Sequence, residues 1–156
     1  LALVLAVVYI GSGIAISVKP DVPAAVEEGS QPDGYATVTM VHDLMQAQLD
    51  GLGGWLPNDL PLTPGWMVDN LPSFQLGVLQ TSRHATRVLR DNLTRQRTSD
   101  AVHKETDLAY SAFANDPQRW AFPSAEGAFG RGNAALERFR ADLGGQAAFY
   151  PRADNL

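Results

Sequence analysis

The chain has 156 residues, no cysteine and a formal net charge of -5 at neutral pH. Without cysteine it forms neither a disulfide framework nor a thiolate metal site. Its negative charge disfavours broad nucleic-acid binding, which needs clustered Lys and Arg, so no nucleic-acid partner is expected. The length suffices for one modest domain beside a membrane segment.

Residues 1–18 read LALVLAVVYIGSGIAISV and contain no charged side chain. As a helix this stretch would be about 27 Å long, close to the hydrocarbon thickness of about 30 Å. The alternatives are a buried soluble helix or a signal-peptide core, with Ala24 and Ala25 as its cleavage site. Such a core is typically shorter. We therefore predict a transmembrane helix over residues 1–18, surrounded by membrane lipid.

Small side chains on this segment predict a face on which another membrane helix packs closely. Ala2, Ala6 and Gly13 lie roughly on one side, and Gly11 and Ala15 form a second pair with helical spacing. We expect contact with other membrane protein subunits at these positions.

Flanking charges predict the orientation of the segment. Residues 19–34 carry a single positive side chain, Lys19, and four acidic ones. Because cytoplasmic flanks usually carry the excess of Lys and Arg, we expect the rest of the chain in the periplasm, attached to a bacterial inner membrane by one span. Three prolines and two glycines make residues 19–34 a predicted spacer between membrane and domain.

Residues 35–156 are predicted to form a soluble all-α domain of four or five helices. Apolar side chains recur every three or four residues over 35–52, a pattern typical of an amphipathic helix, which the glycines at 51, 53 and 54 end. Further helices are expected over 72–97, with Asn70 as cap and Pro72 as first residue, from Asp100 to about 115, from Ser124 to about 143, and from 146 onwards. No segment alternates apolar and polar residues over strand length.

Between the first two of these helices lies a connector that opens the stretch WLPNDLPLTPGWMVDNLPSFQLGVL, residues 55–79. Proline every few residues prevents a single helix, while the apolar content predicts an ordered, packed element. Trp55, Trp66, Met67 and Asp59 are its candidate contact surface. Burial of the indoles is the expectation we favour; exposed, they would offer stacking platforms to a cell-wall glycan or a lipid headgroup layer. Residues 120–123, WAFP, repeat the aromatic–proline theme.

No pattern of residues indicates catalysis, a cofactor or a metal. His42, His84 and His103 fall on three different predicted helices, and no phosphate loop or nucleophile motif occurs. Asp59 and Asp69 could form an acid/base pair near the tryptophans, although both also suit turns and caps. We expect no enzyme activity and no cofactor.

Basic side chains dominate the outer half of the helix predicted over 72–97. They are Arg83, Arg87, Arg90, Arg95 and Arg97, with Asp91 as the acidic exception. A solvated face paired with the acidic spacer or with Asp100, Glu105 and Asp107 is the favoured interpretation, and contact with anionic lipid or an acidic partner is the alternative.

Three motifs carry a family resemblance: GGWLPNDLPLTPGWMVDNLPSFQLGVL, PSAEGAFGRG and FYPRADNL. From about Leu44 to the end, the chain resembles a proteobacterial family of uncharacterised inner-membrane proteins, known as a domain of unknown function. The resemblance implies one N-terminal membrane anchor and brings no catalytic residues. Members are typically about twice as long, which implies a second helical half after Leu156.

The sequence therefore predicts an anchored helical protein that serves as an accessory or scaffold subunit of an inner-membrane complex. A periplasmic glycan- or lipid-binding module that uses Trp55 and Trp66 is the alternative. A hydrolase acting through Asp59 or Asp69 is the remotest hypothesis.

Overall fold

The computed structural model describes residues 1–26, 29–67, 69–95, 101–145, 147, 149 and 150, without the side chains of Trp66 and Met67. Within this part the helices are α1 (Ala2–Ile16), α2 (Tyr35–Leu49), α3 (Asn70–Val88), α4 (Lys104–Phe113) and α5 (Ala125–Asp142). Three short elements join them: the 3₁₀ turns η1 (Leu56–Asn58) and η2 (Pro64–Met67), and the π-helical turn η3 (Leu89–Leu93). Extended pairing in the described residues is limited to a bridge between Leu143 and Ala147. The all-α prediction is confirmed.

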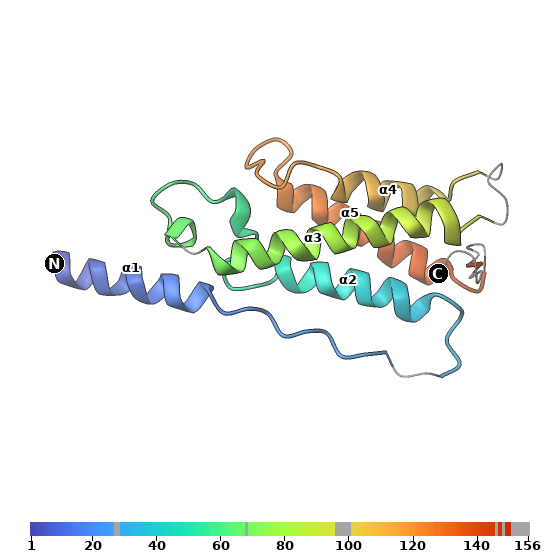
Figure 1. Ribbon diagram of the computed structural model, residues 1–156, viewed down its shortest axis with the longest axis horizontal. Helices are drawn as coiled ribbons and strands as arrows, with labels where there is room; N and C mark the ends of the chain where they lie inside the picture. Colours follow the sequence, from blue (N-terminus) through green and yellow to red (C-terminus); the bar gives the residue numbers. More distant parts are fainter. Residues whose placement is uncertain (27–28, 68, 96–100, 146, 148, 151–156) are drawn as a thin grey trace.

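Helices α2 to α5 form a four-helix bundle from which α1 projects at one end (Figure 1). Each bundle helix packs against two neighbours, in the order α2, α3, α4, α5 and back to α2. The core follows the apolar stripes of the sequence. Its largest side chains are Val38, Met45, Trp55, Leu79, Leu89, Phe113, Phe129, Leu136 and Phe139.

The end of α2 and the start of α3 differ from the prediction. Leu52 is 81% exposed and is no part of the core, because α2 ends at Leu49 and Asp50 caps it. Asn70 lies inside α3 and is not its cap, since Asp69 occupies the N-cap position without a side-chain capping bond. Pro72 is then the third helical residue, where its missing N–H costs no hydrogen bond.

The predicted helix over 72–97 is divided into two parts. α3 ends at Val88, and the chain continues as the π-helical turn η3 to Leu93. Arg97 and Asp100, which the sequence analysis placed on the basic face and at a cap, lie outside the described residues.

His103, rather than Asp100, caps α4 in the structure: its Nδ1 accepts a hydrogen bond from the backbone N–H of Glu105 at 3.3 Å. Val102 is exposed and is not on the core side. The predicted cap of α5 is confirmed, because Ser124 Oγ accepts from the N–H of Gly127 at 3.1 Å. In the helix predicted from 146, the described residues 147, 149 and 150 are not helical.

The predicted spacer lies along the bundle. Near its start, the Lys19 ammonium is 5.2 Å from the centre of the Phe74 ring, and Pro20 faces Gly51. Near its end, Pro32 faces Gly144 after α5. The described residues between α1 and α2 therefore follow the bundle from one end to the other (Figure 1).

α1 is shorter than the span predicted over residues 1–18. Its 15 residues make a helix of about 22 Å, against about 30 Å of hydrocarbon. Among the described residues, no helix combines the length and the apolar character needed to cross a membrane.

Candidate functional site

One end of the molecule joins three segments that are distant in sequence: α1, the connector 55–67 and the loop 117–124. We call it the apolar end. The Tyr9 hydroxyl of α1 lies 3.1 Å from the carbonyl oxygens of both Leu62 and Thr63. Asn58 in turn donates its amide N–H to the carbonyl of Arg119 at 3.1 Å. These bonds hold the connector between α1 and the loop.

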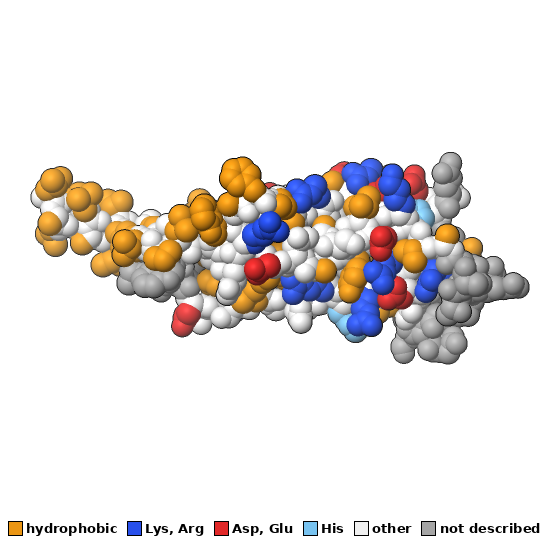
Figure 2. Space-filling view, turned by 90° about the horizontal axis from the view of Figure 1, so that it is seen from above, with side chains coloured by type: hydrophobic (Ala, Val, Ile, Leu, Met, Phe, Trp, Pro, Cys, Tyr) orange, Lys and Arg blue, Asp and Glu red, His pale blue; other side chains and the backbone are white. Residues whose placement is uncertain are grey.

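The apolar end carries most of the exposed large hydrophobic side chains. Figure 2 shows them over α1 and the adjoining end of the bundle, while charged side chains cover the opposite half. On α1 they are Leu3, Val4, Leu5, Val7, Val8, Ile10 and Ile14; on the loops they are Leu60, Leu62, Trp120 and Phe122. Such a concentration marks an interaction surface.

Leu62 and Phe122 stand at the tips of the two loops with unusual backbone conformations. Their φ angles are 76° and 37°, and among the described residues only these two other than glycine have positive φ. Such conformations cost on the order of 1–3 kcal/mol each and persist where the surroundings enforce them. Leu62 is 81% and Phe122 is 94% exposed, so the strain presents large apolar side chains to the outside.

Trp55, the first candidate contact residue, is buried at 1% exposure. Its indole N–H donates to the carbonyl of Pro117 at 2.8 Å, and its ring meets Phe129 edge-to-face at 4.9 Å. The favoured expectation of burial is confirmed, and the assignment of Trp55 to a contact surface is wrong. The side chains of Trp66 and Met67, the other apolar candidates, lie outside the described part of the chain.

The two candidate carboxylates face different surroundings. Asp59 is half-buried beside Gly65 and accepts a hydrogen bond from the Thr63 hydroxyl at 3.4 Å. Burial raises the pKa of Asp59 above its ordinary value, and the nearby Glu126 carboxylate adds to the increase. Asp69 is exposed and lines a crevice of about 310 Å³ between α1 and η2.

The two small-residue faces of α1 have different environments. Gly13 lies on the side of Tyr9, where a Cβ would be 3.8 Å from the carbonyl oxygen of Pro64. That side packs on the connector. Gly11 and Ala15 lie on the opposite side, and a Cβ at Gly11 would meet nothing within 4 Å. Ala2, Ala6 and Ala15 are exposed.

A basic crevice of about 370 Å³ lies between α3 and α4, lined by Gln80, Arg83, His84, Arg87, Tyr110 and Ala114. Arg83 donates to the carbonyls of Phe113 and Asn115 at the end of α4, where a cation suits the helix dipole. Burial lowers the pKa of Arg83 below its ordinary value. This arginine has a structural role.

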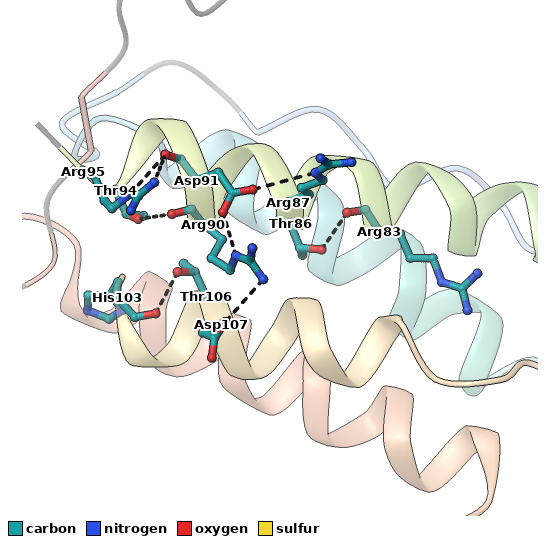
Figure 3. Close-up of polar contacts among 10 residues, drawn as sticks. All are labelled: Arg83, Thr86, Arg87, Arg90, Asp91, Thr94, Arg95, His103, Thr106 and Asp107. Atoms are coloured by element: carbon teal, nitrogen blue, oxygen red, sulfur yellow. Dashed lines mark hydrogen bonds and ion pairs between the residues drawn. The ribbon is translucent and has the colours of Figure 1, made fainter. Parts of the chain in front are cut away.

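Arg90 lies in η3, the turn after α3, and connects it with α4 (Figure 3). It donates to Asp91 at 2.7 Å, approaches Asp107 at 3.5 Å, and lies 4.3 Å from the centre of the Tyr110 ring. The hydrogen bond to Asp91 is the largest cause of its raised pKa. Pairing of the basic face with Asp107 is therefore confirmed, whereas Glu105 binds Arg138 of α5 at 2.9 Å.

The histidines do not meet in the structure. His42 Nδ1 lies 2.7 Å from a carboxylate oxygen of Asp43 at the edge of the core, His84 lines the basic crevice, and His103 caps α4. In the part that the structure describes, no group of three or more His, Asp and Glu side chains could hold a metal ion.

Sequence reasoning found the aromatic–proline loop 120–123 but not its role. The loop is held against the connector by the hydrogen bond between Asn58 and Arg119, which joins residues 61 positions apart. Nothing in the sequence indicates the positive φ of Leu62, because leucine rarely adopts this conformation.

Comparison with known proteins places the chain in one family. Neither the curated proteins nor the solved structures contain a match to it. One family profile matches over residues 1–156, the whole chain. The chain therefore belongs to DUF2333, a family of uncharacterized proteins conserved in bacteria.

Proposed function

We propose that this protein is a membrane-anchored helical subunit that serves as an accessory or scaffold in a bacterial inner-membrane complex. The observation that carries the proposal is α1, which projects from the bundle (Figure 1), has no charged residue and exposes its large apolar side chains. Such a helix is unfavourable in water, at about 25 cal/mol per Å² of apolar surface. Covering this apolar surface with lipid or an apolar partner is therefore favourable in free energy.

The anchor lies at one end of a bundle with its own core, and the two are joined by Tyr9 and the connector. This arrangement suits a domain held against a membrane in a fixed orientation. We place the bundle on the periplasmic side, because the flank after α1 carries Lys19 as its single cation over residues 19–34.

A partner helix is supported by the side of α1 opposite the connector. Val4, Val8, Gly11 and Ala15 form a stripe at helical spacing there, and Gly11 leaves room for a second backbone. We therefore assign partner contact to Gly11 and Ala15. Ala2, Ala6 and Gly13 share the side that carries the connector contact.

Two measurements test the proposal. After alkaline carbonate extraction, the protein should remain with the bacterial membrane, and native mass measurement in mild detergent should give a complex heavier than the chain. Replacing Gly11 and Ala15 by leucine should reduce this mass, whereas Ala6→Leu should not. Extraction into the soluble fraction, or an isolated monomer in gently solubilised membranes, would contradict the proposal.

The glycan-binding alternative loses its main support. The indole of Trp55 is enclosed by the core and offers no face to a sugar. Lipid remains a partner that the exposed loops fit.

A further inference from the structure

The loops of the apolar end expose apolar side chains beside an anchor that already belongs in lipid. Leu62 and Phe122 come from different loops, and each has a positive φ and an exposed side chain. Trp120 lies next to Phe122 and is 66% exposed. The Arg119 guanidinium donates to the carbonyl of Phe122 at 3.0 Å, which holds this tip in place.

We propose that the loop tips carrying Leu62 and Phe122, with Trp120, insert into the interface of the lipid bilayer that holds α1. The inference rests on the proposed function, because it takes α1 as the membrane segment. The protein then contacts the membrane at three points, and the two loops fix the tilt of the bundle relative to the bilayer.

Continuity with α1 selects lipid as the occupant of this surface. The Tyr9 hydroxyl touches the backbone at Leu62 and Thr63, so the connector tip lies at the level of the middle of α1. Any bilayer that surrounds the first half of α1 reaches this tip. Two separate tips form no single groove for a peptide, whereas a fluid lipid surface accepts both without complementary shape.

The position of Tyr9 indicates the depth of insertion. Residues 1–8 of the anchor are exposed and uncharged, and Tyr9 is the first that its own chain partly covers. Tyr and Trp are enriched at the boundary between lipid and water. Lys19 follows the other end of α1, and Asp69 lines the crevice beside the second half of the helix; both are exposed and charged. The boundary therefore runs near Tyr9, with residues 1–8 in the hydrocarbon.

The absence of cysteine from the chain permits a direct test with single cysteines. The variants Leu62→Cys and Phe122→Cys probe the loops, Leu5→Cys probes the anchor, and Leu108→Cys is the control on an exposed position of α4. Each full-length variant is labelled with a polarity-sensitive fluorophore and reconstituted into phosphatidylcholine vesicles or phosphatidylethanolamine–phosphatidylglycerol vesicles. Quenching by nitroxide-bearing lipids is then measured, after circular dichroism has shown that the variant is folded.

We expect probes at 5, 62 and 122 to be quenched at least twofold more than the probe at 108, in both kinds of vesicle, because the contact is apolar. If the probe at 5 is quenched and both loop probes report water, the loop insertion is overturned and the anchor stays in place. Loop probes that report an apolar environment but are not quenched by the nitroxide lipids would show that protein, and not lipid, covers the loops. This result would also overturn the loop insertion. No quenching at 5 would overturn the proposed function itself.

Discussion

The indole N–H of Trp55 donates to the carbonyl of Pro117, 62 residues further along the chain, at 2.8 Å. The bond joins the start of the connector to the loop after α4, and the ring beneath it packs on Phe129. A residue that resembled a surface platform in the sequence thus fastens the apolar end to the core.

Trp55→Phe should lower the free energy of unfolding by about 1–3 kcal/mol, because it removes this hydrogen bond and leaves a small cavity. Urea denaturation in mild detergent measures the change. The control is Trp120→Phe on the exposed loop, which should stay within about 0.5 kcal/mol of the wild type. Equal effects of the two substitutions would contradict the role given to Trp55.

Gln75 is the polar link between the connector and the bundle, and it is 1% exposed. Its carbonyl accepts from the N–H of Leu56 at 3.0 Å, and its amide donates to Gly54 at 2.8 Å and Gln48 at 3.3 Å. Gln75→Leu leaves these backbone groups without their partner, at about 1–3 kcal/mol for each group that water cannot reach.

We expect Gln75→Leu to destabilise the protein by about 2–4 kcal/mol and to speed proteolysis within residues 55–67. The matched control is Gln80→Leu on the exposed side of the same helix. Unchanged cleavage in the Gln75 variant would show that the connector does not depend on this side chain.

Gly132 of α5 lies directly under α4. A Cβ there would be 2.8 Å from Cε1 of Phe113 and 3.0 Å from Cβ of Ala112, and Phe113 is fully buried and has no room to move. Gly130 on the same helix has nothing within 4 Å of such a Cβ. The two positions form a matched pair.

Gly132→Ala should destabilise by about 1–3 kcal/mol through overpacking, whereas Gly130→Ala should stabilise by up to about 1 kcal/mol through helix propensity. Thermal unfolding of both variants measures the difference. A stabilising effect at both positions would mean that α4 and α5 are further apart than described.

Asp59 should make stability depend on pH. Because its pKa in the folded protein is raised above the ordinary 3.8, the folded state binds the proton more tightly than the unfolded state. The free energy of unfolding therefore falls as the pH rises from below 3.8 through the raised pKa. Asp59→Asn removes this loss and should stabilise the protein at pH 7 more than at pH 3. Urea midpoints of both proteins across this range test the sign, and a constant or reversed difference would contradict it.

Local signals in the sequence were sufficient for much of the fold. The Ser124 cap, the glycines after α2 and the apolar stripes each depend on neighbours within about one turn. Trp55 was correctly expected in the core because a large indole gains much from burial. The family resemblance was likewise correct.

Contacts between residues that are distant in sequence could not be predicted from such local signals. The glycines at 127, 130 and 132 look alike in sequence, and only the packing of Phe113 distinguishes Gly132. The positive φ of Leu62 and Phe122 contradicts the local preference of both residue types. For that reason the candidate contact surface lies at Leu62 and Phe122, and not at Trp55.

The direction of α3 determines how much of a membrane's electrostatic potential reaches its arginines. The helix begins beside the crevice at α1 and carries Arg87 near its far end, about 26 Å along its axis. The potential of an anionic bilayer decays within about 8 Å at physiological ionic strength. If α1 is the membrane anchor, as proposed, guanidinium groups so far from it are screened from the lipids. The basic face of α3 then faces the aqueous compartment, where an acidic protein or a soluble anion is the partner it can attract.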